Sequence, residues 1–438
     1  MKCERHVFST KVMRKTLATD FDLVCGQEWK VPLSQSFFFA GVLIGAAVFG
    51  YLGDVWGRKN MFLVALLETT ICGIGAALST SFLMFTIFQF FTAMGQIGVF
   101  MTVFVLGIEI VGKSKREFCG IVSGYFFVGG EILLALVASY FQDWRKIQLA
   151  SVLPGVLFFS YYFVLPQSIR WLIEKGKFAK AREELNKIAR GNKVALPTDQ
   201  ELQLFKKGEL DWLSTNHESL LDLLKSPKLL LRLFNVFLNW IVIVMIYYGL
   251  SMNATSLAGD IFSNFALLSL AEVPGFTLSY LGMTYKGRRA TLATSLIIGG
   301  ASCLISSLLP YKYTTLATFF FLVGKFGATA AFGTTYLYTS ELFPTSVRNA
   351  CVGLSSMMGR VGAMLSPYVA MLGVLTGKPW LPMLVFAAAA LFSGFLTFFL
   401  PETKGKSLPR TMEEAENLGL SSTRVNGYQE IVSEEEKS

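Results

Sequence analysis

The feature that most constrains this chain is a series of eleven apolar runs, most of about 20 residues. A helix of that length spans a bilayer, and a backbone in lipid has to satisfy its own hydrogen bonds. Charged residues make up 16% of the chain, against about 25% in soluble domains. The sequence therefore predicts an all-α membrane protein and excludes a soluble enzyme. The predicted spans are 33–53, 61–79, 83–108, 118–140, 148–166, 233–251, 261–283, 290–309, 315–338, 349–374 and 380–400.

The positive charges are concentrated in a few loops, although the net charge of the whole chain is +9. Arg58 and Lys59 lie between the first two runs, and the segment 167–232 is rich in Lys and Arg. Because cytoplasmic loops are enriched in Lys and Arg, we predict an extracellular amino end and a cytoplasmic carboxyl end. The basic charge is thus a topology signal, so we expect a lipid bilayer and no nucleic acid as partner.

An internal repeat divides the chain into two halves. Glu109 and Arg116 recur 232 positions later as Glu341 and Arg348. The first half holds five runs and the second six, whereas a repeat predicts equal numbers. We therefore expect a twelve-helix architecture whose first helix is missing. The predicted parts are the remnant of a first outer loop (1–32), an N-terminal bundle (33–166), a cytoplasmic linker (167–232), a C-terminal bundle (233–400) and a cytoplasmic tail (401–438).

A short loop between the first two runs combines glycines, an acid and two adjacent cations. It reads Gly50-Tyr-Leu-Gly-Asp54-Val-Trp-Gly57-Arg58-Lys59, and a copy without the acid, Thr284-Tyr-Lys-Gly-Arg-Arg289, follows in the second half. The alternative is an ordinary basic loop that only sets topology. The pattern resembles the signature loop of the major facilitator superfamily of transporters, which implies the major facilitator fold.

We expect the repeated acid–arginine pairs at the predicted cytoplasmic helix ends to control conformational gating. The acids would pair with the cations of the signature loops and lock an outward-open state. The predicted gating residues are Gly50, Asp54, Gly57, Arg58, Lys59, Glu109, Arg116, Glu341 and Arg348.

Further stretches resemble the organic ion transporters, and above all their organic cation/carnitine branch. They include FDLVCGQEWKVPL at 21–33, VLPQSIRWL at 164–172 and VGKFGATAAFGTTYLYTSELFPTSVRNACVG at 323–353. The resemblance runs from about residue 3 to about residue 410. It implies plasma-membrane transport of small organic cations or zwitterions such as carnitine by alternating access. Gln96 matches a glutamine that this family links to sodium coupling, so the resemblance also implies coupling to Na⁺.

Two positions separate the branches of that family. Arg360 stands where organic cation transporters carry Asp, and the carnitine and organic anion branches carry Arg there. Val99-Phe100 replaces a polar–aromatic pair of the carnitine branch. Two alternatives stay open: an organic anion transporter, and a truncated non-transporting isoform or fragment that associates with or regulates full-length transporters.

Four ionisable residues lie near the middle of predicted spans: Glu131, Glu272, Lys325 and Arg360. Such residues are unfavourable in hydrocarbon and usually face a cavity. Their formal charges add up to zero, so we expect a neutral cavity with separated acidic and basic poles. Such a cavity would suit a zwitterion. The alternative is a set of structural ion pairs between packed helices.

The side chains around these charges indicate how a zwitterion would bind. Arg360 can hold a carboxylate through two parallel hydrogen bonds. Aromatic faces attract a quaternary ammonium group by cation–π interaction, and the candidates are Tyr247, Phe100, Tyr248 and Tyr125. The predicted substrate-binding residues are Arg360, Lys325, Glu272, Glu131, Tyr247, Phe100 and Gln96; we expect no catalytic residue, metal or cofactor.

Two further motifs have simpler explanations. GIEIVGKS at 107–114 fits the phosphate-binding pattern GxxxxGKS. That motif normally follows a strand and opens a helix, whereas here it ends a predicted membrane helix, so we interpret it as a topological loop. Asn253-Ala-Thr255 is a glycosylation sequon, but we expect crowding against the membrane to prevent its use.

Overall fold

The computed structural model describes residues 8–111, 116–192, 220–257, 259–406, 408–409 and 411–418. Every named element in these ranges is a helix, and Lys15 and Asp143 form an isolated β-bridge. The described part of the chain is therefore all-α, as predicted.

Each predicted apolar run falls on a helical segment. Ten of these segments are long and apolar enough to cross a membrane, and α17 is a shorter apolar helix. The segments are α2 (Lys30–Trp56), α3 (Arg58–Ala77), α4 (Phe82–Ile110), α5 (Arg116–Phe141), α6–η2–α7 (Trp144–Val152, Leu153–Ser160, Tyr161–Val164), α12 (Pro227–Met252), α13 (Ile261–Tyr285), α14 (Arg288–Leu308), α15 (Thr314–Leu342), α16 (Arg348–Thr376) and α17 (Leu381–Thr397).

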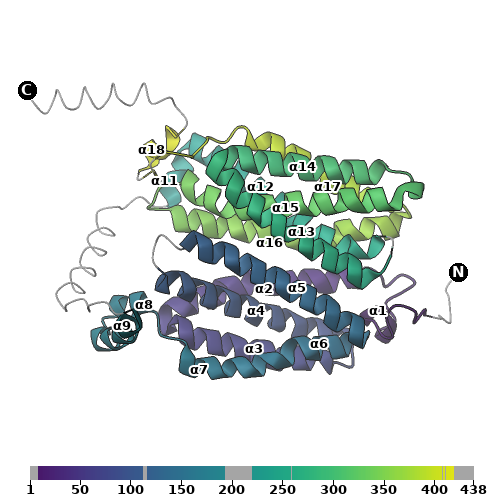
Figure 1. Ribbon diagram of the computed structural model, residues 1–438, viewed down its shortest axis with the longest axis horizontal. Helices are drawn as coiled ribbons and strands as arrows, with labels where there is room; N and C mark the ends of the chain where they lie inside the picture. The colour runs from purple at the N-terminus through teal and green to yellow at the C-terminus, as the bar shows by residue number, and fades with distance from the viewer. Residues whose placement is uncertain are drawn as a thin grey trace, which may run out of the picture.

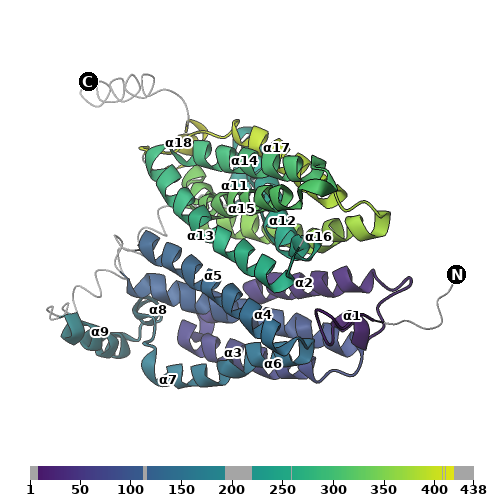
Figure 2. The ribbon, with the colours of Figure 1, turned by 45° about the vertical axis from the view of Figure 1, so that its right-hand side comes forward.

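The long helices form two bundles that lie one above the other in Figure 1. The N-terminal bundle contains α2 to α7, and the C-terminal bundle contains α12 to α17 (Figures 1 and 2). The bundles meet where α2 packs against α16 and α5 packs against α13. The interface is therefore formed by α2 and α5 of the N-terminal bundle and by α13 and α16 of the C-terminal bundle.

Small residues allow the helices of each bundle to approach closely. A Cβ atom on Gly45 of α2 would lie 2.5 Å from the Met94 carbonyl oxygen of α4. A Cβ atom on Gly362 of α16 would lie only 2.1 Å from the Ile241 carbonyl oxygen of α12. Both contacts bring one backbone against another, so neither position has room for a side chain.

Short helices occupy the two ends of the bundles. Helix α1 (Leu17–Asp20) lies at one end, and α8 (Ile169–Glu174) and α9 (Phe178–Asn192) lie at the other, as Figures 1 and 2 show. The described carboxyl-terminal helices at this other end are α11 (Leu220–Lys225) and α18 (Met412–Glu416). The described helices of the segments predicted to be cytoplasmic therefore gather at one end.

Two segment boundaries differ from the sequence prediction. Helix α12 begins at Pro227 and α2 at Lys30, so both extend into stretches assigned to polar segments. Lys228 and Arg232 are part of α12. A helix can continue beyond its apolar run when the additional charged residues lie at the end of the helix. Much of the predicted linker, the last residues of the GIEIVGKS string and the side chain of Arg116 lie outside the described residues.

Candidate substrate-binding site and gate

A charge pair is buried inside the C-terminal bundle. Lys325 Nζ of α15 lies 2.7 Å from Glu272 Oε1 of α13, and the two side chains are 1% and 0% exposed. Pro274, two residues after Glu272, is inside α13. A proline inside a helix removes one backbone hydrogen bond and bends the helix, so the acid stands next to an irregular part of the backbone.

Helix α12 supplies the remaining partners of this pair. The Tyr247 hydroxyl donates to Glu272 Oε2 at 2.8 Å. Lys325 Nζ donates to Ser251 Oγ at 2.8 Å and to the Tyr247 carbonyl oxygen at 3.2 Å. The same ammonium lies 3.5 Å from the centroid of the Tyr247 ring. Three helices therefore meet at one hydrogen-bonded cluster, which we call the Lys325 cluster: Lys325, Glu272, Tyr247 and Ser251.

The expectation of separated acidic and basic poles is wrong for Glu272 and Lys325. These two groups neutralise each other directly, which matches the structural ion pair named as the alternative. The physical reason is that an isolated buried charge is strongly unfavourable, whereas a paired and hydrogen-bonded one is tolerated.

Arg360 has a different environment on α16. Its guanidinium donates to the Ser356 hydroxyl at 2.5 Å and to the Ser356 carbonyl oxygen at 3.1 Å, and it also contacts the Tyr336 hydroxyl. Among the described residues, no carboxylate lies within 4.0 Å of it. Its guanidinium is therefore available to a carboxylate of a ligand.

A row of aromatic rings connects the Lys325 cluster with Arg360. The Tyr247 ring stacks on Phe332 with centroids 5.3 Å apart, and Phe332 meets Tyr336 at 5.7 Å. Tyr336 in turn contacts Trp240 at 4.4 Å. Tyr336 is 37% exposed. This aromatic row is thus the apolar surface between the two cationic groups.

The sequence analysis missed Phe332, Tyr336 and Trp240. Phe332 and Tyr336 are spaced i, i+4 on the same run as Lys325, which places them on one helix face. That spacing could have identified them. Trp240 is spaced i, i+7 with Tyr247 on one run, but only the packing of α12 against α15 brings it to Tyr336.

The other predicted binding residues lie in the N-terminal bundle. Glu131 of α5 is near enough to Glu272 of α13 to interact with it electrostatically. Phe100 of α4 is 52% exposed and stacks on Phe104 at 5.8 Å. Gln96 of α4 is also exposed. Glu131 is therefore within electrostatic range of the Lys325 cluster, while Gln96 and Phe100 share a separate exposed face of α4.

The second-half gate has the pairing that the sequence predicted. Arg288 donates to Glu341 Oε1 at 2.8 Å, and Thr403 donates to Glu341 Oε2 at 2.6 Å. Glu402 accepts from the backbone N–H groups of Arg288 and Arg289. Arg348 of α16 is near enough to interact electrostatically with Glu341.

The first-half gate is built differently from the prediction. Arg58 pairs with Asp54 of its own loop at 2.6 Å, and Glu109 accepts from the Ser168 hydroxyl at 2.5 Å. The Trp171 indole donates to the Asp54 carbonyl oxygen at 2.8 Å. The expected pairing of Glu109 with the signature-loop cations is therefore wrong in this arrangement, because Ser168 at the start of α8 occupies the acid.

In the first signature loop, Gly50 to Lys59, the glycines and Lys59 have different neighbours. Gly57 has φ +94°, and a Cβ atom on it would lie 3.2 Å from the Trp171 ring. Gly50 has open space beside it. Lys59 lies 4.8 Å from the centroid of the Tyr162 ring. Only Gly57 is therefore constrained both by its backbone angle and by close packing.

The two bundles touch near the end where α2 begins and α12 ends. Ser36 of α2 donates to the Met364 carbonyl oxygen of α16 at 2.7 Å. Phe39 of α2 meets Tyr248 of α12 with ring centroids 4.7 Å apart. The described gate contacts at the opposite end stay within one bundle. Further along the interface, the hydroxyls of Tyr125 on α5 and Thr277 on α13 lie 3.0 Å apart, so the bundles are joined at more than one level.

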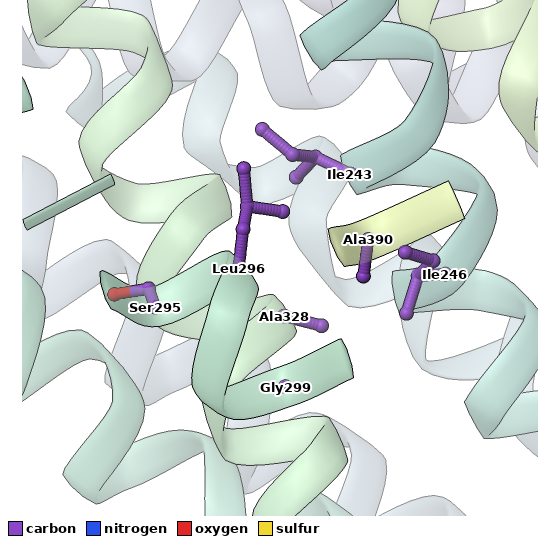
Figure 3. A pocket seen from close by; sticks show the side chains of 7 residues that line it. All are labelled: Ile243, Ile246, Ser295, Leu296, Gly299, Ala328 and Ala390. Atoms are coloured by element: carbon purple, nitrogen blue, oxygen red, sulfur yellow. The ribbon is translucent and has the colours of Figure 1, made fainter. Parts of the chain in front are cut away.

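A small cavity inside the C-terminal bundle is not this site. It lies between α12, α14, α15 and α17 (Figure 3). Its volume of about 10 Å³ is of the order that the centre of one water molecule needs. The lining is almost entirely apolar: Ile243, Ile246, Ser295, Leu296, Gly299, Ala328 and Ala390. We interpret it as a packing gap.

The described helices thus form two bundles, with a buried charge cluster inside the C-terminal bundle and, on α16, an arginine that has no carboxylate partner among the described residues. Residues 8–415 match the family model described as sugar (and other) transporter. The chain belongs to this family of the major facilitator superfamily, among the organic cation/carnitine transporters. Its relatives are transporters and not enzymes.

Curated relatives support the branch. Organic cation/carnitine transporter 2 of Homo sapiens is 38% identical over 411 residues, which cover 93% of this chain and 73% of that protein. Organic cation transporter protein of Drosophila melanogaster is 35% identical over 423 residues, which cover 95% and 77%. The predicted resemblance is therefore confirmed.

A solved structure confirms the fold. The inward-open conformation of the xylose transporter XylE from E. coli superimposes with a TM-score of 0.72 at 16% sequence identity, covering 92% of this chain and 93% of that one. At this identity the likeness shows the major facilitator fold and nothing about the substrate.

Proposed function

We propose that this chain transports small organic cations or zwitterions such as carnitine across the plasma membrane by alternating access. The observation that carries the proposal is Arg360, a guanidinium in the interior of α16 without a carboxylate partner among the described residues. A carboxylate of the substrate would fill this place, because arginine binds carboxylates with two parallel hydrogen bonds.

The aromatic row offers the second half of the binding site. Tyr336 stands between Arg360 and Phe332 and is partly exposed. A quaternary ammonium group would lie on these rings through cation–π attraction. Carnitine carries a carboxylate and a quaternary ammonium, so it can engage both features at once. The names of the relatives in this branch agree with such a substrate.

The test compares two substrates in purified protein reconstituted into vesicles. We expect Arg360→Lys to weaken carnitine uptake about tenfold or more, because a lysine cannot form the paired hydrogen bonds. Arg360→Asp should favour tetraethylammonium over carnitine. Arg232→Lys is the control, since Arg232 on α12 donates to the Ala415 carbonyl oxygen at the far end of the helix. An unchanged ratio of the two substrates in both Arg360 variants would remove Arg360 from the site.

The same assay separates the other readings. An organic anion transporter would take up benzoate and ignore tetraethylammonium, but Glu131 beside the Lys325 cluster disfavours an anion there. A regulatory chain that does not transport would leave every substrate outside the vesicles. We also propose coupling to Na⁺ through Gln96, for which uptake should fall when Na⁺ is replaced and Gln96→Leu should abolish that difference.

A further inference from the structure

Positive charges gather on the short helices at the predicted cytoplasmic end of the N-terminal bundle. Residues 170–190, which include α9 and most of α8, hold seven cations and three acids. Arg170 and Lys187 pair with acids of the same segment. Three further cations are exposed and have no carboxylate within 4.0 Å among the described residues: Lys175, Lys177 and Lys180. We call these three residues the lysine surface.

Helix α8 fixes the lysine surface beside the start of α3. The Trp171 indole of α8 donates to the Asp54 carbonyl oxygen at 2.8 Å, and a Cβ atom on Gly57 would lie 3.2 Å from the Trp171 ring. Lys177 Nζ lies 4.7 Å from the centroid of the same ring. Helix α9 packs on α8 through buried Ala181, and both helices lie together in Figure 1. The position of the three lysines is therefore set by the packing of α8.

The end of α7 marks the boundary of the bilayer on this side. Tyr162 and Phe163 are 51% and 86% exposed, and aromatic side chains are enriched where a span meets the lipid headgroups. Lys59 of α3 lies 4.8 Å from the centroid of the Tyr162 ring. Helix α8 begins five residues after Val164, the last residue of α7, so its start lies within about 18 Å of that residue. The lysine surface is therefore close to the level of the headgroups.

The placement of these lysines does not stabilise the helices that carry them. Cations near the amino end of a helix oppose its dipole, and the first turn of α9 contains Lys180 and no acid. The apolar residues of α8 and α9 pack against each other in a cluster of their own, so they do not insert into lipid. The repeat counterpart of this segment, residues 401–418, holds four acids and three cations. The surplus of cations is thus specific to the N-terminal bundle's segment.

We propose that the lysine surface binds the headgroups of anionic phospholipids in the predicted cytoplasmic leaflet. The ammonium groups donate to phosphate and carboxylate oxygens of the headgroups. Each lysine near an anionic membrane surface typically strengthens binding by about fivefold. The partner is a lipid and not a soluble anion, because the three cations directly follow a membrane span and lie near the level of its aromatic residues.

A lipid bound there would act on the first-half gate through α8. The Ser168 hydroxyl at the start of α8 donates to Glu109, and Trp171 holds the Asp54 carbonyl oxygen of the signature loop. An anionic lipid that keeps α8 in place stabilises both contacts. Transport would then depend on the charge of the lipid, a consequence that rests on the proposed function.

Native mass spectrometry of the purified chain in detergent tests the binding without transport. The protein is titrated with phosphatidylserine and, separately, with phosphatidylcholine. We expect the triple variant Lys175→Gln/Lys177→Gln/Lys180→Gln to bind phosphatidylserine at least about tenfold more weakly and phosphatidylcholine equally well. The same three changes to arginine keep the charge and should keep the lipid.

The matched control is Lys228→Gln/Lys286→Gln/Lys406→Gln, which removes three exposed lysines from the same end of the C-terminal bundle. It should bind phosphatidylserine as the unchanged chain does. Equal binding by the first triple variant and the unchanged chain overturns the proposal, and so does an equal loss in both triple variants. A surface that takes a soluble anion or an acidic peptide gives the first of these two results.

Uptake of tetraethylammonium tests the effect on the gate. The vesicles consist of phosphatidylcholine with or without one fifth of phosphatidylserine. Uptake by the unchanged chain and by the control variant should change several-fold with phosphatidylserine, and uptake by the first triple variant should not. An equal dependence in all three proteins contradicts the link to the gate. If no protein transports, the proposed function fails, while mass spectrometry still decides whether the lysine surface binds the lipid.

Discussion

The two bundles of this protein differ in how completely they are packed. In the C-terminal bundle the buried share of the apolar part of each long helix is 50% in α12 and α14, 44% in α15 and 28% in α13 and α16. In the N-terminal bundle it is 44% in α3 and 33% in α2 and α4, but only 11% in α5 and 6% in the α6–α7 segment. Two large apolar clusters, around residues such as Trp240 and Phe321, lie mainly in the C-terminal bundle, and the first of them also includes Phe39 of α2. The cluster of the N-terminal bundle consists of Phe49, Met61 and Ala65 with a few neighbours.

This difference bears on the proposed binding site. The buried ion pair, the aromatic row and Arg360 all belong to the C-terminal bundle, whose packing restricts their motion. The N-terminal bundle adds Glu131 at the interface and the contacts of Ser36 and Phe39 at the predicted extracellular end. We infer that the C-terminal bundle holds the binding groups in place and that the N-terminal bundle moves against it.

The largest expected effect comes from breaking the buried pair. Lys325→Met leaves the Glu272 carboxylate buried without its cation, which typically destabilises a protein by about 3–5 kcal/mol. The double variant Lys325→Met/Glu272→Met should recover most of this loss, because neither charge remains. Thermal unfolding in detergent measures both, with Glu68→Gln in the N-terminal bundle as the control. A single variant as stable as the unchanged protein would show that the C-terminal bundle tolerates the charge.

A smaller effect is expected from adding a methyl group where helices touch. Gly362→Ala brings a Cβ atom to 2.1 Å from the Ile241 carbonyl oxygen, and Gly45→Ala brings one to 2.5 Å from that of Met94. Overpacking typically costs about 1–3 kcal/mol, and we expect the larger loss at Gly362, where the surrounding bundle is less able to shift.

The control for this comparison is Gly353→Ala on α16, beside which there is open space. It should leave stability unchanged or slightly raise it, since alanine favours a helix. If Gly45→Ala proves the more damaging of the two, the N-terminal bundle is the more rigid one and the comparison is reversed.

The smallest expected effect concerns how the stability of the protein depends on pH through Asp20, at the predicted extracellular end of the N-terminal bundle. Partial burial raises the pKa of Asp20, but hydrogen bonds from Trp144 and Arg145 outweigh it and hold that pKa below its usual range. A carboxyl with a lowered folded-state pKa adds stability above its unfolded pKa of about 3.9. This stability is lost as the pH falls through the folded pKa.

Asp20→Asn should therefore lower the melting temperature at neutral pH. It should not do so at a pH below both the folded-state and the unfolded-state pKa of Asp20. Asp22→Asn is the matched control in the same segment. An identical melting curve for Asp20→Asn and the unchanged protein at neutral pH would show that this contact does not contribute to the stability of the N-terminal bundle.

Much of the fold was predictable from the sequence because lipid leaves few choices. An apolar run of about 20 residues has to form a helix when no water is present to satisfy its backbone. Ten of the eleven runs lie on a single α-helix, and the fifth lies on the consecutive helical segments α6, η2 and α7. The same argument singled out Glu272, Lys325 and Arg360, since ionisable groups are rare inside spans. The repeat of Glu109 as Glu341 was likewise visible in the sequence.

Only the tertiary structure decided which of these groups are partners. Composition shows that the charges of four in-span residues add up to zero, but it does not show that Lys325 neutralises Glu272 while Arg360 is held by Ser356. The same holds for Glu109, which meets Ser168 instead of the signature-loop cations. Distances between side chains on different helices depend on the rotation and crossing of those helices. Those are set by many small packing contacts, such as the close approach at Gly362, that no single run of residues encodes.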